Sequence, residues 1–147
     1  MTNETLAGDS PLSPHSLAAI AAEVPRPANG ADRRTLGAYG EELAARYLET
    51  SGMEILARNW RCRYGELDLI ARTPELTAFV EVKTRSGLGF GVPAEAVTFA
   101  KRQRIRRLAL LWLAEQERPW RRLRFDVVSV LLQRGHQPVV DHLQSVF

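Results

Sequence analysis

The sequence lacks several features that would set it apart from ordinary globular proteins. Its single cysteine, Cys62, excludes an internal disulfide and a cysteine-based metal site. No apolar run comes near the roughly 20 residues that a membrane-spanning helix needs. The apolar stretch from Leu17 to Val24 is short, broken by Glu23 and preceded by acidic residues, so we expect no secretory signal. Together these absences favour a protein of the reducing cytoplasm.

Charge and proline are unevenly spread along the 147 residues. Residues 1–32 hold four acidic side chains against Arg26, a net of −3, so the other residues carry +6. Four of the eight prolines also lie in residues 1–32. We therefore expect a flexible acidic tail over residues 1–32, in which a helix from Pro14 would be marginal, and a domain over residues 33–147. The basic domain suggests a polyanionic partner, above all nucleic acid.

Hydrophobic periodicity predicts an α/β fold with a mixed central β-sheet and flanking helices. One helix is expected from about Arg34 to Gly52, and another from about Ala94 to Gln116, after a Gly-rich loop over residues 86–93. Strands are expected over residues 54–62, 66–71, 78–83, 123–132 and 139–147. The expected order along the chain is therefore α-β-β-β-α-β-β.

The runs at residues 66–71 and 78–83 predict a hairpin with one apolar face and one mixed face. Side chains alternate across a strand, so successive residues point to opposite faces. The apolar face, which we expect to be core, holds Leu67, Leu69, Ala71, Ala78, Val80 and Val82. The mixed face holds Glu66, Asp68, Ile70, Phe79, Glu81 and Lys83. Because two large apolar residues lie among these charges, we expect the mixed face to be partly covered.

The position of the turn determines which residues of the hairpin face each other. A turn centred just after Pro74 places Asp68 opposite Glu81 and Glu66 opposite Lys83, unless a bulge shifts the register. Two carboxylates with Cβ atoms about 5 Å apart are destabilising unless something sits between them. Magnesium prefers oxygen ligands and typically takes one or two protein carboxylates. The pattern therefore predicts a site for Mg²⁺ or Mn²⁺ at Asp68 and Glu81.

A solvated strand face, on which Glu66 or Glu81 pairs with Lys83, is the alternative. For an isolated Glu-x-Lys tripeptide that alternative would be the better interpretation. Here the charged residues lie on two adjacent strands and are flanked by strong strand formers, which favours the metal site.

The segments Gly65–Ala71 and Phe79–Arg85 resemble the core of the PD-(D/E)xK nuclease superfamily. More narrowly, the chain resembles the YraN-type family of uncharacterised endonuclease-like proteins, which are similar in fold to archaeal Holliday-junction resolvases. The resemblance covers nearly everything after residue 34 and includes Gly37–Glu41, Tyr47–Leu48, Arg58–Arg61, Gly91–Val97 and Arg124–Val128. Leu67 stands where the superfamily name has proline, a departure that many members share.

The resemblance implies a restriction-endonuclease-like fold and metal-dependent hydrolysis of DNA, with branched or structured DNA among the candidate substrates. It implies that Asp68 and Glu81 bind the metal together with the backbone carbonyl of Val82. It also implies that Lys83 orients or polarises the attacking water. A positive charge beside the metal would favour the negative charge that develops on the phosphate.

Related nucleases often supply a further carboxylate from the first helix, and Glu41 is at the matching position. On a helical wheel Glu41 lies at the margin of the apolar stripe, whereas Glu42 lies on the polar face. We therefore expect Glu41 to join the catalytic residues and Glu42 to be solvated. The alternative role for Glu41 is an acid that stabilises the start of the helix.

Basic residues of the second helix are candidates for nucleic-acid contacts. Lys101 falls on the buried stripe of that helix, so it must reach a rim or a site, unless it only snorkels past the core edge. Arg102 and Arg106 lie one turn apart on the exposed side and suit phosphate contacts, although such a charge run is more often a solvated face.

Two further arginines flank the hairpin. Arg85 could close over a substrate together with the Gly-rich loop, because glycines allow mobility. Arg61 belongs to residues 58–64, which interleave basic and aromatic side chains and could contact a backbone or stack on an exposed base. Alternatively, Trp60 in this segment is part of the core.

Two functional interpretations remain open at this stage. The first is a metal-dependent endonuclease acting on DNA. The second is a non-catalytic protein on a nuclease-like fold that binds nucleic acid or a partner protein. The intact set of two acids and a lysine favours the enzyme. A homodimer is compatible with the resemblance, because related junction resolvases are dimers, and no membrane partner is expected.

Overall fold

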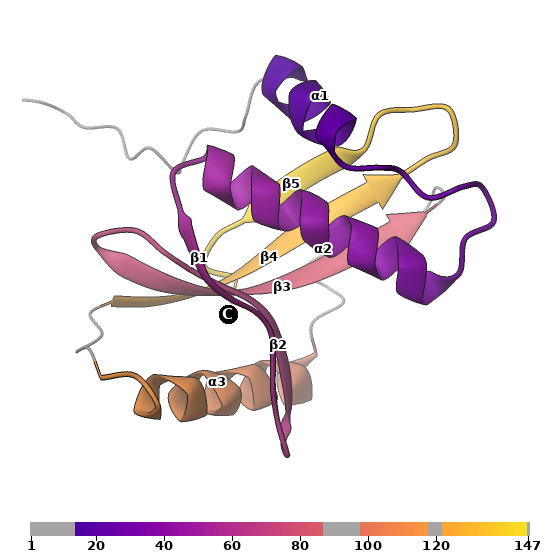
Figure 1. The fold of residues 1–147 in the computed structure, drawn as a ribbon. Coiled ribbons are helices and arrows are strands. Elements are labelled where there is room, and N and C mark those ends of the chain that lie inside the picture. Colours follow the sequence, from indigo (N-terminus) through magenta and orange to yellow (C-terminus); the bar gives the residue numbers. More distant parts are fainter. Residues whose placement is uncertain (1–13, 87–97, 118–121, 147) are drawn as a thin grey trace, which may run out of the picture.

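The computed structural model describes residues 14–86, 98–117 and 122–146, which fold into a five-stranded mixed sheet with helices on both faces (Figure 1). Within these residues the helices are α1 (Pro14–Glu23), α2 (Arg33–Thr50) and α3 (Phe99–Ala114). The strands are β1 (Glu54–Cys62), β2 (Gly65–Arg72), β3 (Leu76–Ser86), β4 (Arg122–Leu132) and β5 (Val139–Leu143). The mixed α/β class and the five strands predicted from the sequence are confirmed.

The strands lie side by side in chain order, β1-β2-β3-β4-β5. Strands β3 and β4 are parallel, and every other neighbouring pair is antiparallel. A parallel pair needs a crossover connection, and α3 lies within it, on the opposite face of the sheet from α1 and α2 (Figure 1). The sheet is therefore covered from both sides. None of the helices within the described ranges is both long and apolar enough to cross a membrane.

Local capping fixes where the two longer helices begin. Asp32 caps α2 by accepting a hydrogen bond from the Thr35 N–H at 2.8 Å. Thr98 caps α3 in the same way, accepting from the Lys101 N–H at 3.2 Å. Helix α2 ends just before Gly52, whose positive φ of 101° suits a residue that follows a helix. The expected start of the second helix, residues 94–97, lies outside the described part of the chain.

The core consists of two hydrophobic clusters, one on each face of the sheet. The first packs α1 and α2 against Leu69, Ala71, Ala78 and Val80 and against β4 and β5. The second packs α3 against Leu67, Ile70 and Phe79. The mixed face of the predicted hairpin is thus covered, because α3 packs over its apolar residues Ile70 and Phe79. Glu81 on the same face lies near the start of α3, where it pairs with Lys101.

The predicted hairpin register is confirmed over four pairs, from Leu69 opposite Val80 to Arg72 opposite Thr77. One facing assignment is wrong. Leu67, expected beside Leu69 on the α2 side, packs in the α3 cluster instead. Between Gly65 and Asp68, β2 has no pairing with β3 and pairs only with β1. This end of the β1–β2 hairpin curls past the sheet toward α3 (Figure 1). The strong twist of such a two-stranded ribbon turns Leu67 toward the helix.

The segment predicted as a flexible tail is structured from Pro14 onward. Helix α1 packs on α2, and its Ile20 and the following Val24 are buried in the first cluster. The helix would be marginal in isolation, but burial of these apolar side chains against the domain stabilises it. The expectation for residues 1–13 lies outside the described residues. The observed element order therefore differs from the expected one by the addition of α1.

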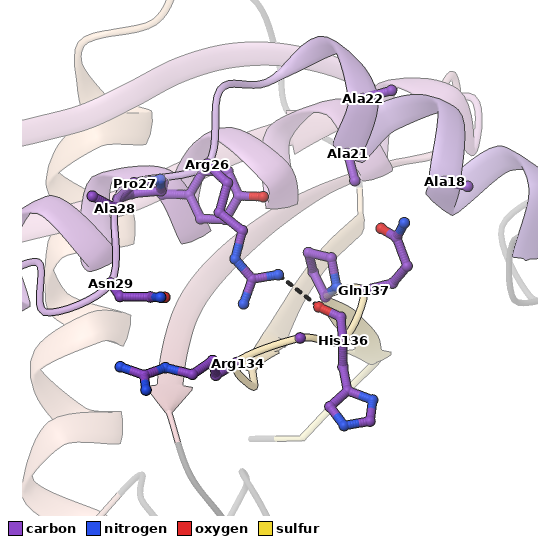
Figure 2. A pocket seen from close by; sticks show the side chains of 13 residues that line it. Ala18, Ala21, Ala22, Arg26, Pro27, Ala28, Asn29, Arg134, His136 and Gln137 are labelled. Carbon is purple, nitrogen blue, oxygen red and sulfur yellow. Dashed lines mark hydrogen bonds between the residues drawn. The ribbon is translucent and has the colours of Figure 1, made fainter.

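Arg26 ties the segment after α1 to the turn between β4 and β5. Its Nη1 donates to the His136 carbonyl at 2.6 Å (Figure 2). Its Nη2 donates to the Gln133 carbonyl at 2.8 Å. Arg26 and His136 line a cavity of about 770 Å³ between α1, α2 and the turn, to which Tyr39 and Arg134 also contribute. Among the described residues, no acidic side chain lines the cavity, and neither Asp68 nor Glu81 is part of it.

Strand β5 is shorter than the expected run to residue 147. It ends at Leu143, because Ser145 has a positive φ of 53° and turns the chain. The Ser145 N–H donates to Asp126 Oδ1 at 3.1 Å. The N–H of Val146 donates to the Phe125 carbonyl at 2.9 Å.

Gly40 of α2 packs directly against Thr84 of β3, and Gly40→Ala is expected to destabilise the protein. A Cβ at Gly40 would overlap the Thr84 side chain, so overpacking should cost about 1–3 kcal/mol despite the better helix propensity of alanine. Gly37, one turn earlier, has open space around an added Cβ, and Gly37→Ala should be neutral or stabilising by up to about 1 kcal/mol. Urea unfolding of both variants tests this, and equal stabilities would contradict it.

Candidate active site

Asp68 and Glu81 lie where β2 and β3 separate. The pairing of the two strands ends at Leu69 and Val80, and Asp68 and Glu81 are the next residues on each strand. The Asp68 side chain takes over the next backbone donor, accepting from the Val82 N–H at 2.8 Å. Asp68 is only 9% exposed, so this carboxylate is held in a nearly buried position at the fork of the sheet.

Two lysines neutralise Glu81. The Lys101 Nζ of α3 lies 2.5 Å from Glu81 Oε1, and the Lys83 Nζ lies 3.7 Å from the same oxygen. Lys101 projects from the buried stripe of α3 toward the sheet, and its ammonium contacts Glu81. The structure therefore brings Asp68, Glu81, Lys83 and Lys101 together from three elements.

The close packing of these charges shifts their protonation. Burial and the negative charge of Glu81 raise the pKa of Asp68 to about 8, although the Val82 N–H opposes the shift. Burial and the neighbouring Lys101 ammonium lower the pKa of Lys83. Burial is the largest single effect on Lys101 and acts to lower its pKa, but the interactions with Glu81, Lys83 and Asp68 together outweigh burial and the pKa is raised. Two carboxylates and two ammonium groups thus share one poorly solvated space.

Glu41 of α2 approaches the same group of charges. It is half-buried, and its carboxylate accepts a hydrogen bond from the Asn59 side chain. Burial raises the pKa of Glu41, Asn59 offsets part of this, and the negative charges of Glu66 and Glu81 raise it further. Glu41 also contributes to the raised pKa of Asp68. The position of Glu41 at the edge of the apolar stripe therefore directs it toward the site.

Glu42 was expected to be solvated, but its side chain is partly covered and forms two ion pairs. Its carboxylate pairs with Arg46 Nε at 2.9 Å and with Arg58 Nη1 of β1 at 2.5 Å. The Arg46 hydrogen bond lowers the pKa of Glu42 against the opposing effect of burial. Glu42 thus connects α2 to β1, a role that the helical wheel could not reveal because Arg58 comes from another element.

Asn59 is a site residue that sequence reasoning missed. It lies on β1 between two paired positions, Arg58 with Leu69 and Trp60 with Leu67, which places it opposite Asp68. Its φ is 49°, a left-handed conformation that asparagine tolerates better than most residues. Asparagine is also depleted in strand interiors, and this was the available signal. In this backbone conformation, the Asn59 side chain donates its hydrogen bond to Glu41.

The remaining predicted arginines lie around the site rather than in it. Arg61 is exposed and pairs with Glu66 at 2.9 Å. Arg85, two residues beyond Lys83 on β3, is half-buried and lines a hollow of about 370 Å³ between β3 and α2. The Gly-rich segment was expected to act with Arg85. From residue 87 onward it lies outside the described residues, which resume at residue 98.

Arg102 and Arg106 lie one turn apart on α3, and Arg106 is exposed as expected. The Arg106 guanidinium lies over the Phe125 ring, 5.5 Å from its centroid. Arg102 is half-buried, and its Nε has no hydrogen-bond partner among the described residues. Neither forms an ion pair with the carboxylates at the fork, so their role in nucleic-acid binding stays a prediction.

The donor set at the fork fits a hard divalent cation with few protein ligands. Across residues 14–86, 98–117 and 122–146, no group of three or more histidine, cysteine, aspartate or glutamate side chains is arranged to hold a metal. The chain would therefore supply two carboxylates, Asp68 and Glu81, which suits Mg²⁺, since it keeps several waters. Burial and the charge of Glu81 both raise the pKa of Asp68, so a negative charge on this carboxylate is unfavourable without a nearby cation.

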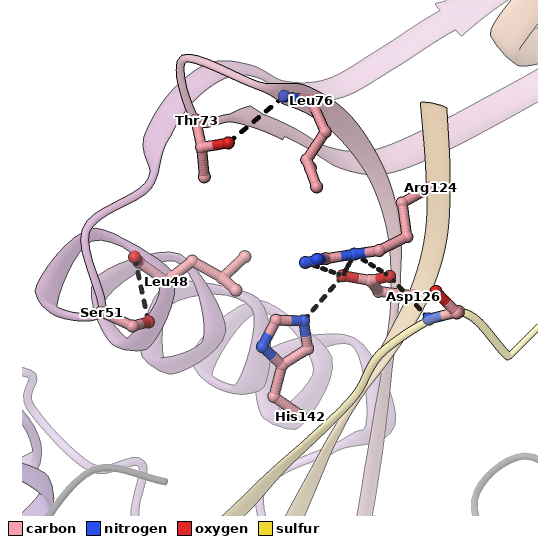
Figure 3. A network of polar contacts seen from close by, with 8 residues as sticks. Leu48, Ser51, Thr73, Leu76, Arg124, Asp126 and His142 are labelled. Carbon is pink, nitrogen blue, oxygen red and sulfur yellow. Dashed lines mark hydrogen bonds and ion pairs between the residues drawn. The ribbon is translucent and has the colours of Figure 1, made fainter. Parts of the chain in front are cut away.

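A second buried carboxylate, Asp126 of β4, has a structural environment instead. It is fully buried. It accepts hydrogen bonds from Arg124 Nε at 2.9 Å and from the Ser145 N–H at 3.1 Å, and its Oδ2 lies 2.8 Å from His142 Nε2 (Figure 3). Burial acts to raise the pKa of Asp126, but these hydrogen bonds outweigh it and the pKa is lowered. Asp126 therefore joins β4, β5 and the C-terminal turn, as a structural residue would.

Comparison with known proteins identifies relatives across most of the chain. The model of a family described as uncharacterised protein family UPF0102 matches residues 40–130. A UPF0102 protein of Nocardia farcinica is 76% identical over 116 residues, 79% of this chain and 91% of the relative. UPF0102 proteins of Rhodococcus opacus and Mycolicibacterium smegmatis are 60% and 55% identical, over 76% and 78% of this chain and 95% and 94% of their own lengths. The chain belongs to the UPF0102 family.

Proposed function

We propose that this protein is a metal-dependent endonuclease that hydrolyses DNA phosphodiester bonds. The observation that carries the proposal is the fork between β2 and β3, where a nearly buried Asp68 meets Glu81 while Lys83 and Lys101 contact Glu81. Oxygen ligands for a cation and ammonium groups for a phosphate are thus available within one site. The resemblance of this hairpin to PD-(D/E)xK nucleases supports the same chemistry, with branched or structured DNA as the candidate substrate.

Asp68 and Glu81 would hold Mg²⁺ or Mn²⁺. When bound, this cation would supply positive charge against the charge that develops on the phosphate and would make a water molecule more acidic. Lys83 would orient the attacking water and stabilise the same developing charge. The pKa of Lys83 is lowered by burial and by Lys101, so its ammonium can release a proton more readily than an exposed lysine.

Lys101 and Glu41 would complete the site from the two helices. The ion pair of Lys101 fixes the orientation of Glu81, and a phosphate could attract the same ammonium. Glu41, held by Asn59, would add a third carboxylate near the first two. The two helices cover opposite faces of the sheet (Figure 1), and Lys101 and Glu41 bring a side chain from each of them to Glu81.

A cleavage assay on single-stranded, duplex, flapped, nicked and four-way DNA in Mg²⁺ or Mn²⁺ tests this function. We expect Asp68→Asn, Glu81→Gln and Lys83→Met each to reduce cleavage about 100-fold or more, because each removes a group that acts on the reacting phosphate or its cation. Glu49→Gln, which changes an exposed carboxylate on α2, is the matched control and should cleave like the native protein. Cleavage that survives all three site variants would contradict the proposal.

A non-catalytic binding protein is the second candidate, favoured by one observation. Glu81 already has two ammonium partners, and a carboxylate neutralised in this way can persist without a metal. Calorimetry with Mn²⁺ separates the two candidates. A heat of binding that is lost in Asp68→Asn supports the enzyme. DNA binding without any Mn²⁺ heat and without cleavage of any substrate supports the binding protein.

A further inference from the structure

The tip of the β1–β2 hairpin and the adjacent side of α3 form a basic surface around one exposed aromatic ring. We call it the tip surface, and it consists of Arg63, Tyr64, Arg104 and Arg107. Tyr64 is 40% exposed. The guanidinium carbons of Arg63 and Arg107 lie 5.0 Å and 4.1 Å from the centroid of its ring. Cation–π attraction therefore gathers two arginines at the end of the hairpin.

Close packing holds the hairpin tip against α3. Gly65, with φ of 140°, follows Tyr64 directly. A Cβ at Gly65 would lie 3.4 Å from Leu108 Cδ1 and 3.7 Å from Arg104 Cδ, so the backbone of the tip rests on these two helix side chains. Trp60 of β1 also packs against the α3 cluster. The tip surface is therefore built from two elements in a fixed relation.

The arginines of the tip surface carry unbalanced positive charge. Arg61 and Arg72, on the same hairpin, each pair with a glutamate. Within the part of the chain that the structure describes, Arg63, Arg104 and Arg107 form no ion pair with a carboxylate. Like charges gathered in this way repel one another, and a polyanion relieves that repulsion. The surface thus suits a chain of phosphates.

The tip surface is continuous with the fork. Along α3, Lys101 pairs with Glu81, and Arg104 and Arg107 follow at intervals of three residues. Residues three apart lie on neighbouring turns with an offset of about 60° around the axis, so this row of basic residues winds along α3 from the fork to the tip. Strand β2 makes the same connection, since three residues separate Gly65 at the tip from Asp68, about 10 Å along a strand.

We propose that the tip surface binds the nucleic-acid strand on one side of the cleaved phosphate. The arginines contact backbone phosphates, and Tyr64 stacks on an unpaired base. A phosphate that draws one guanidinium off the ring exposes that ring face to a base. The inference rests on the proposed function for its ligand, and it narrows the substrate class to DNA with a single-stranded segment beside the cut site.

Fluorescence anisotropy with a labelled 20-nucleotide single strand and the matching duplex, in EDTA, tests the proposal without cleavage. The variant Arg63→Gln/Arg104→Gln/Arg107→Gln should bind the single strand more weakly. Its plot of log affinity against log salt should be shallower by about 2, since each lost phosphate contact removes about 0.7. Arg72→Gln at the other end of the hairpin, where Arg72 pairs with Glu54, is the matched control and should keep the native slope.

Tyr64 provides the test of stacking. Tyr64→Ala should weaken single-strand binding about fivefold or more and affect the duplex less, while Tyr64→Phe should bind like the native protein. A slope equal to that of the control in the triple variant would overturn the phosphate contacts. An equal effect of Tyr64→Ala on both DNAs would overturn the stacking. Because no metal is present, failure here is distinct from failure to cleave.

Discussion

In EDTA at pH 7, the Asp68→Asn variant is expected to be more stable than the native protein by roughly 2–4 kcal/mol. Asp68 is nearly buried beside Glu81, and its pKa is raised to about 8. Asparagine keeps the shape of the side chain, can still accept from the Val82 N–H and carries no charge. The site therefore trades stability for the ability to bind a cation, as functional sites often do.

The sign of the pH dependence follows from this shift. The folded-state pKa of Asp68, about 8, lies above the unfolded value of about 3.9, so the folded protein holds the proton between these values. The native protein should lose stability as pH rises through that window, while Asp68→Asn should not. Thermal unfolding between about pH 5 and pH 8 measures the difference. Asp141→Asn, at an exposed position of β5, is the control, and a native protein as stable as Asp68→Asn at every pH would contradict the expectation.

Magnesium gives this prediction a second readout. Added Mg²⁺ should raise the unfolding temperature of the native protein, because a ligand that binds only the folded state stabilises it. Added Mg²⁺ should leave the unfolding temperature of the Asp68→Asn variant unchanged. A similar shift in both proteins would place the cation elsewhere than at Asp68.

The variant Asp126→Asn is expected to lose about 3–5 kcal/mol of stability at pH 7. Asp126 has no exposed surface, and its ion pair with Arg124 and its contact with His142 are also largely buried. Removal of the carboxylate charge leaves the Arg124 guanidinium buried without its counter-charge, which costs more than the pair contributes. The hydrogen bonds join β4 to β5 and to Ser145, so the whole C-terminal edge of the sheet depends on them.

The pH dependence of this effect has the opposite sign to that at Asp68. Hydrogen bonds from His142 and Arg124 lower the pKa of Asp126 against the effect of burial. Its contribution is therefore full above the unfolded pKa of about 3.9 and is lost as pH falls through the lower folded value. Urea unfolding compares Asp126→Asn with the control Glu54→Gln. Glu54 forms an exposed pair with Arg72, so its removal should lower the free energy of unfolding by only about 0.5 kcal/mol. Similar losses in both variants would contradict the role of Asp126.

The sequence by itself determined the hairpin that carries the candidate site. Alternation of apolar and charged residues defined the strands, and the turn after Pro74 set a register that the structure reproduces from Leu69 opposite Val80 onward. Strand periodicity and hairpin register are local properties, because they depend on residues close together in the chain. For the same reason, helical periodicity placed Lys101 on the buried stripe of its helix and Glu41 at the margin of its stripe.

Only the tertiary structure decided what meets at the fork. The pairing of β2 with β3 stops at Leu69, and Leu67 turns toward α3. The register of β1 against β2 places Asn59 opposite Asp68. Likewise, α1 was predicted to be marginal because its burial partners lie on α2 and are absent from its own segment. Contacts between distant segments depend on packing, which local patterns do not encode, and packing is what brings Lys101 and Glu41 from opposite faces of the sheet to one group of charges.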